Sequence, residues 1–220
     1  MYVVLLFFSI LFHKHVQEKS YTLLCLGDSY TIGESVTAEE RFPDQAITIL
    51  KKENIRFKDP IIVARTGWTS QNLISAIDKA NFENTFDYVT VLIGVNDQFQ
   101  GVDTSEYAAN FERLIKNAIQ CTAGMKDHVI VFSIPDYSVS PFAAHLRKPQ
   151  ELISNEIDAF NTVNRKIAEE YQVQYIDINP ISKKAKTDIT LLAPDGLHTS
   201  GKMYGIWAEF LAKEIRIQIE

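Results

Sequence analysis

The sequence is poor in the residues that break regular structure. It contains nine glycines and seven prolines in 220 residues, and 46% of its residues are hydrophobic. This composition excludes a disordered or repeat protein and predicts one globular domain with a substantial core. The two cysteines, Cys25 and Cys121, lie far apart and lack metal-ligand spacing. Because Cys25 lies within an apolar run, we expect it to be a buried free thiol.

Positive charge is also scarce. Lysine and arginine together number 22 against 28 aspartates and glutamates, which gives a formal net charge of −6. An acidic chain is a poor match for a nucleic-acid surface or for electrostatic attachment to acidic lipid. We therefore expect a small-molecule partner and no nucleic acid. The sequence leaves the oligomeric state open.

No hydrophobic run is long enough to be a transmembrane helix. The longest, Met1–Phe12, has twelve residues, whereas a spanning helix needs about 20. It resembles a signal-peptide core but lacks a basic leader and a small-residue cleavage site. A lipoprotein signal ending at Cys25 would have bulky Leu24 before the cysteine and would remove most of the first predicted strand. We predict a separate segment 1–18 followed by a domain at 19–220. Localisation stays open between export or membrane association and a cytoplasmic protein.

Short β-rich runs alternate with longer amphipathic stretches. The predicted strands are Tyr21–Leu26, Pro60–Ala64, Tyr88–Ile93, His128–Ile134 and Val173–Ile178. The predicted helices are Phe42–Glu53, Ser70–Lys79, Ser105–Cys121, Leu152–Tyr171 and Lys202–Ile219. The strands are almost continuously apolar, as expected for strands covered on both faces. The alternation predicts an α/β fold in which a parallel sheet lies between two helix layers.

Polar residues follow the first three strands and precede the last helix. The segments are "GDS" with Ser29, "RTGWTS" with Gly67, "IGVND" with Asn96, and "APDGLHTS" with Asp195 and His198. Because the carboxyl ends of parallel strands share one edge of the sheet, we expect the first three segments to lie close together. A long loop with three prolines, Pro135–Gln150, follows the fourth strand and should overhang the same edge.

These residue types are those that acyl transfer requires. Ser29 can act as a nucleophile, His198 as the base that takes and returns its proton, and Asp195 as the group that orients the imidazole. Donors for a developing oxyanion are the backbone N–H groups of Ser29 and Gly67 and the side-chain amide of Asn96. Singly, each residue has an ordinary explanation as a helix cap or turn. Together, in this order, they favour a catalytic site.

The four segments, taken in order, resemble the signature blocks of the SGNH, or GDSL-type, hydrolases, and the resemblance covers essentially the whole domain. It implies a flavodoxin-like three-layer α/β/α sandwich with five parallel strands and no metal or organic cofactor. It also implies a catalytic triad of Ser29, Asp195 and His198, with an oxyanion hole formed by Ser29, Gly67 and Asn96.

Two departures from related patterns are visible. Tyr30 and Thr31 follow the serine directly, so the G-x-S-x-G elbow of the larger α/β-hydrolases is missing. The family's glycine block often reads N-x-G-x-x-G, but Arg65 and Ser70 stand here where the asparagine and the second glycine would be. We therefore expect this loop to make different hydrogen bonds from those of its relatives.

The predicted activity is serine-dependent hydrolysis of carboxylic esters, either short-chain acyl esters or acetylated carbohydrates. Lysophospholipid hydrolysis and acyl transfer to a sugar hydroxyl are alternatives on the same site. A non-catalytic anion-binding domain is the alternative outside enzymes, although the Asp195–His198 pair argues against it. Four aromatic residues are candidates to line an acyl or sugar pocket: Tyr30, Trp68, Phe99 and Phe142.

Overall fold

A computed structural model describes residues 19–82 and 85–219, so the predictions for residues 1–18 lie outside the described part. Its main sheet has five parallel strands in the order β4-β2-β5-β6-β7. They comprise β4 (Ile61–Ala64), β2 (Leu23–Gly27), β5 (Tyr88–Leu92), β6 (Val129–Phe132) and β7 (Gln174–Ile176). In chain order this is the 2-1-3-4-5 arrangement of flavodoxin-like sheets. The predicted fold class is confirmed.

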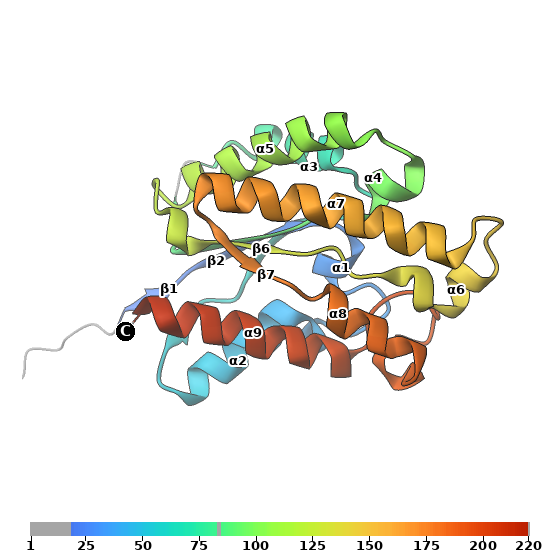
Figure 1. The fold of residues 1–220 in the computed structure, drawn as a ribbon. Helices are drawn as coiled ribbons and strands as arrows, with labels where there is room; N and C mark the ends of the chain where they lie inside the picture. The colour runs from blue at the N-terminus through green and yellow to red at the C-terminus, as the bar shows by residue number, and fades with distance from the viewer. Residues whose placement is uncertain (1–18, 83–84, 220) are drawn as a thin grey trace, which may run out of the picture.

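Helices cover both faces of the sheet (Figure 1). On one face α2 (Phe42–Lys52) packs against α9 (Gly201–Ile219). On the other face α5 (Thr104–Cys121) packs against both α3 (Ser70–Ala80) and α7 (Gln150–Tyr171). The five predicted helices match these in place and type, with ends that differ by at most two residues, because their apolar positions recur at helical spacing.

Burial differs between the central and the edge strands. Every residue of β2, β5 and β6 is buried, whereas all residues of the edge strands β4 and β7 are partly or fully exposed. The expectation of cover on both faces therefore holds for the central strands only. Cys25, on β2, is a fully buried free thiol, as predicted, and burial raises its pKa to about 12.

The first predicted strand, Tyr21–Leu26, is in fact two strands. A short strand β1 (Ser20–Tyr21) pairs in parallel with β3 (Arg56–Phe57), separately from the main sheet. The break falls at Thr22, whose backbone N–H and hydroxyl both donate to the Asp87 carboxylate, at 2.8 and 2.9 Å. The Asp87 side chain thus binds the Thr22 backbone N–H, which in a continuous strand would donate to a neighbouring strand.

Four short helices lie among the loops that follow the strands. They are α1 (Ser29–Ile32), α4 (Val95–Gln100), α6 (Pro141–Ala144) and α8 (Asn179–Ser182), accompanied by 3₁₀ turns at Ala38–Glu40, Lys126–His128, Tyr137–Val139, Lys183–Lys186 and Ile189–Leu191. Helices of four to six residues show no periodicity, so the sequence did not predict them. Within residues 19–82 and 85–219, no helix combines the length and apolarity needed to cross a membrane.

Candidate active site

The turn from β2 into α1 presents Ser29. A Cβ atom at Gly27 would lie 2.1 Å from the Thr31 hydroxyl oxygen and 2.4 Å from the Leu92 carbonyl oxygen, so only glycine fits there. Asp28 caps α1 by accepting a hydrogen bond from the backbone N–H of Tyr30 at 3.0 Å. Ser29 is therefore the first helical residue, placed at the carboxyl end of a central strand.

Asp28, the residue before Ser29, has a side chain that is almost completely buried. Burial raises its pKa to about 8, against the hydrogen bond from Tyr30 and with help from the nearby Asp97 carboxyl group. Burial therefore favours the neutral, protonated form of Asp28 beside Ser29.

Asp195 and His198 form a hydrogen-bonded pair before α9. The imidazole Nδ1 lies 2.6 Å from Asp195 Oδ2, and Asp195 Oδ1 accepts the backbone N–H groups of Leu197 and His198, both at 2.9 Å. Ser35 donates its hydroxyl to Asp195 Oδ2 at 2.6 Å. Burial alone would raise the pKa of Asp195, but these hydrogen bonds outweigh it and lower the pKa to about 2. Asp195 is thus ionised at any pH at which the protein is assayed.

The side chains of Asn96 and Asp97, which follow β5, form hydrogen bonds to the loop that follows β4. The Asn96 side-chain amide donates to the Trp68 carbonyl at 3.0 Å. The Asp97 carboxylate accepts both the backbone N–H of Ser70, at 2.8 Å, and its hydroxyl, at 2.5 Å. Ser70, the departure from the family pattern, therefore supplies a hydrogen bond that glycine could not make. Burial raises the pKa of Asp97, while the two bonds from Ser70 act in the opposite direction.

Gly67 lies in the turn that these bonds hold. Its φ of 79° is in the left-handed region that favours glycine. The turn closes with a 3.2 Å bond from the Trp68 N–H to the Arg65 carbonyl. The adjacent Thr66 hydroxyl donates to Glu34, beside Ser35. The loops after β2, β4 and β5 are thereby joined by side-chain hydrogen bonds.

A pocket of about 110 Å³ opens among these loops. Its lining residues are Ser29, Tyr30, Val95, Asn96, Phe99, Tyr137, Phe142, Leu197 and His198. Six of them were predicted as site residues: Ser29, Tyr30, Asn96, Phe99, Phe142 and His198. Asp195 does not line the pocket, but its carboxylate contacts Nδ1 of the His198 imidazole. Neither Gly67 nor Trp68 is among the lining residues, and the half-buried Trp68 side chain packs against the core.

Sequence reasoning missed Ser35, Tyr137, Val95 and Leu197. Val95 and Leu197 adjoin the predicted Asn96 and His198, so their positions were a usable signal. Tyr137 lies in the loop predicted to overhang the site, which was also a usable signal. Nothing in the sequence marks Ser35 as a partner of Asp195, because the two are 160 positions apart.

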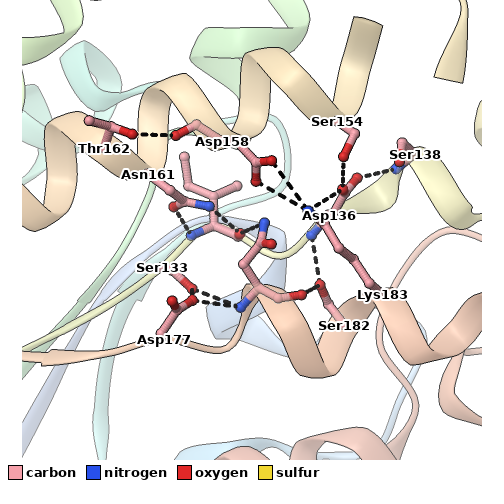
Figure 2. Close-up of polar contacts among 12 residues, drawn as sticks. Ser133, Asp136, Ser138, Ser154, Asp158, Asn161, Thr162, Asp177, Ser182 and Lys183 are labelled. Atoms are coloured by element: carbon pink, nitrogen blue, oxygen red, sulfur yellow. Dashed lines mark hydrogen bonds and ion pairs between the residues drawn. The ribbon is translucent and has the colours of Figure 1, made fainter. Parts of the chain in front are cut away.

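The loop that carries Tyr137 and Phe142 is firmly anchored at its start. Figure 2 shows Asp136 at the centre of a polar network at the ends of β6 and β7. Its carboxylate accepts the Ser154 hydroxyl at 2.5 Å and the Ser138 N–H at 2.8 Å, and it lies 3.5 Å from the Lys183 ammonium group. Tyr137 in turn donates to Gln98 at 3.0 Å, on α4. This side of the pocket is therefore held in place.

Among the residues that the structure describes, no group of three or more histidine, cysteine, aspartate or glutamate side chains is placed to bind a metal ion. The chemistry available at the pocket is that of a hydroxyl group, an imidazole with a carboxylate partner, and amide donors.

Comparison with known proteins identifies the family of the chain. Residues 25–206 match the GDSL-like lipase/acylhydrolase family. An arylesterase from Vibrio mimicus is 23% identical over 214 residues, which cover 96% of this chain and 95% of that protein.

Two solved structures share the fold. The lipase/acylhydrolase from Enterococcus faecalis superposes with a TM-score of 0.71 at 18% identity and covers 90% of this chain and 96% of its own. An acetylxylan esterase from Geobacillus stearothermophilus gives a TM-score of 0.67 at 20% identity, covering 89% and 94%. Since the family match extends over most of the chain, the protein belongs to the GDSL-like lipase/acylhydrolase family and is a carboxylic ester hydrolase.

Proposed function

We propose that the protein hydrolyses esters of short acyl chains through a covalent acyl-enzyme, with Ser29 as nucleophile, His198 as general base and Asp195 as its orienting partner. The observation that carries this proposal is that Ser29, His198 and Asn96 line one pocket, while Asp195, which is not among the lining residues, contacts Nδ1 of the His198 imidazole. Acyl transfer needs this combination; anion binding does not need a base or its partner.

The first half of the reaction follows from these contacts. Asp195 accepts a hydrogen bond from Nδ1–H of His198, which leaves the lone pair on Nε2 to take the proton of the Ser29 hydroxyl. The Ser29 oxygen then bonds to the ester carbonyl carbon, and the carbonyl oxygen becomes an oxyanion. His198 returns the proton to the leaving alcohol, the ester C–O bond breaks, and the acyl group remains on Ser29.

In the second half, water attacks the carbonyl carbon of the acyl-enzyme while His198 takes a proton from it. His198 then returns the proton to the Ser29 oxygen as the bond between that oxygen and the acyl carbon breaks, which frees Ser29 and releases the carboxylic acid. The oxyanion of both steps is stabilised by donors on the nucleophile turn and on the opposite loops, namely the backbone N–H groups of Ser29 and Gly67 and the amide of Asn96. One N–H of that amide binds Trp68, and the NH₂ group has a second one to offer.

The size of the pocket favours a short acyl group. A cavity of about 150 Å³ accommodates benzene, and this pocket measures about 110 Å³. Four of its nine lining residues are tyrosine or phenylalanine, and one of these, Phe99, is 51% exposed. We infer that the acyl chain enters the pocket while the alcohol part, an aryl group or an acetylated sugar, lies over Phe99. The names of the relatives, an arylesterase and an acetylxylan esterase, support both alcohol classes.

Replacement of the nucleophile tests the proposal. Ser29→Ala should lower kcat for p-nitrophenyl acetate by about 10⁴-fold or more, without changing the circular dichroism spectrum. A fluorophosphonate probe should label the wild type at Ser29 and leave the variant unlabelled. Turnover of the variant at the wild-type rate, or labelling at another residue, would refute the assignment. Hydrolysis rates for acetylated oligosaccharides and lysophospholipids, measured in parallel, distinguish the substrate classes. Transfer of the acyl group to an added sugar would show that the protein is an acyltransferase.

A further inference from the structure

Ser35 occupies a backbone conformation that a serine rarely adopts. Its φ is 66°, in the left-handed region that favours glycine. Residues in such conformations persist where the surrounding structure holds them, and they cluster at functional sites. The turn around Ser35 is well held, because the Glu34 N–H donates to the Ser29 carbonyl at 3.0 Å and the Val36 N–H to the Gly33 carbonyl at 3.2 Å.

The conformation aims the Ser35 hydroxyl at Asp195. Its oxygen lies 2.6 Å from Oδ2, the same carboxylate oxygen that His198 Nδ1 contacts at 2.6 Å. Oδ1 is already occupied by two backbone N–H groups. The hydroxyl therefore completes the hydrogen bonding of this carboxylate and ties it to the turn that carries Ser29.

We propose that Ser35 is a positioning residue for the ester hydrolase reaction, which fixes the Asp195 carboxylate and withdraws part of its negative charge from His198. The proposal rests on the proposed function, because it assumes that His198 is the base. A hydrogen bond to a charged carboxylate is stronger than one between neutral groups. Ser35 and His198 bind the same carboxylate oxygen, Asp195 Oδ2, so a change at one of them alters the hydrogen bond that the other makes.

Other titratable groups around the pair set the pH range in which this can be seen. Tyr30 on α1 lies with its ring centroid 5.5 Å from that of His198, and Tyr204 on α9 donates to the Tyr30 carbonyl. Burial raises the pKa of both tyrosines above their ordinary range, so they stay neutral in the assay. Glu34 and Asp28 are the nearby carboxyl groups, and the pKa of Asp28 is raised to about 8 by burial. Measurements between pH 5 and 7 therefore avoid the titration of Asp28.

Three substitutions at one position separate the hydroxyl from the backbone. Ser35→Ala removes the hydroxyl and keeps the backbone strain, Ser35→Gly removes both, and Ser35→Asn keeps a donor in a residue that tolerates left-handed φ. The alanine and glycine variants should show the same fall in kcat, by about 3- to 30-fold, with KM within twofold of the wild type. The acid limb of kcat/KM should move to higher pH, since Asp195 then favours the charged imidazole more strongly. Ser35→Asn should recover part of the rate.

Stability supplies the structural control. Ser35→Gly should unfold at the same temperature as Ser35→Ala or a higher one, because glycine relieves the strain at this φ. The low-field proton resonance of Nδ1–H in His198 should move in both variants. A kcat within twofold of the wild type in both, with an unmoved resonance, would mean that water replaces the hydroxyl and would overturn the inference. So would recovery of the rate in Ser35→Gly alone, which would assign the effect to backbone strain.

Ser29→Ala, assayed beside these variants, keeps the two hypotheses apart. If it is inactive while the Ser35 variants behave as the wild type, only the role of Ser35 is wrong. If it is active, the proposed function is wrong and the catalytic part of the role of Ser35 is wrong with it.

Discussion

Asp28 precedes Ser29 in the chain and Asp195 contacts His198, and the pKa values of the two carboxyl groups are shifted in opposite directions. The Asp28 side chain is almost completely buried and has one backbone N–H partner, so desolvation raises its pKa to about 8. The Asp195 side chain is 31% exposed and accepts four hydrogen bonds, which lower its pKa to about 2. Burial thus favours the neutral form of Asp28, on the side of the proposed nucleophile, and hydrogen bonding favours the charged form of Asp195, on the side of the proposed base.

This difference suits the roles proposed for the two sides of the site. In the proposed mechanism, negative charge beside His198 stabilises the imidazolium that forms when Ser29 loses its proton. Negative charge beside Ser29 would instead oppose the proposed oxyanion. The comparison shows that hydrogen-bond supply and burial, more than residue type, decide what an aspartate contributes to an active site. Substitutions at Asp195, Asn96, Phe142 and Asp28 test this contrast between the two aspartates.

The largest effect is expected on the base side. Asp195→Asn should lower kcat by about 10³- to 10⁴-fold, because a neutral amide neither fixes the tautomer of His198 nor stabilises its charged form. The acid limb of kcat/KM should also move to lower pH. Steady-state kinetics from pH 5 to 8 measure both effects, and thermal unfolding checks that the variant is folded. An Asp195→Asn enzyme of undiminished rate would remove the base side from the mechanism.

The next largest effect is expected at Asn96. Asn96→Ala should lower kcat by about 10²- to 10³-fold, the usual loss for one oxyanion donor, with a much smaller change in KM. A change confined to KM would instead make Asn96 a contact of the bound substrate. Because Asn96 also holds the Trp68 carbonyl at 3.0 Å, hydrogen exchange at residues 65–70 shows whether the turn loosens in the variant.

A smaller effect is expected at the aromatic wall. Phe142→Ala enlarges the pocket, so the ratio of kcat/KM for p-nitrophenyl butyrate over acetate should rise about tenfold, within the range that a hydrophobic pocket discriminates. Phe210→Ala is a matched control, because Phe210 lies exposed on α9 and outside the pocket. Equal preferences in all three enzymes would show that the Pro135–Gln150 loop does not select the acyl chain.

The smallest catalytic effect is expected at Asp28. Asp28→Asn keeps a helix cap and a neutral side chain, so kcat at pH 7 should stay within about threefold of the wild type. The main effect of this substitution is expected in the pH dependence of the free energy of unfolding. Between pH 4 and 8 the folded protein holds a proton on Asp28 that the unfolded chain has lost, so the contribution of this group to the free energy of unfolding falls as pH rises, by at most about 1.4 kcal/mol per pH unit.

The variant should lack this slope. Urea unfolding of both proteins at pH 5, 6 and 7 measures the difference. Parallel curves for the wild type and Asp28→Asn would mean that Asp28 is ionised in the folded state, and the contrast with Asp195 would disappear.

Much of the site could be predicted because the sheet topology places most of its residues. Ser29 and Asn96 follow two neighbouring parallel strands and therefore lie at the same edge of the sheet. Asp195 and His198 are three residues apart and contact each other. What could not be predicted depends on backbone angles. Ser35, with a left-handed φ, places its hydroxyl on the Asp195 carboxylate, and the half-buried Trp68 side chain, after the turn at Gly67, packs against the core and does not line the pocket. The break at Thr22 likewise depends on Asp87, which is distant in sequence.

The Ser35–Asp195 hydrogen bond also has a consequence for the timing of synthesis. It joins residues 160 positions apart, and at a translation rate of about 5–20 residues per second a ribosome needs about 10 to 30 s to cover that distance. During that interval the nascent chain carries Ser29, the proposed nucleophile, but neither Asp195 nor His198, its proposed partners. The proposed triad therefore cannot assemble before residue 198 has been synthesised, long after Ser29.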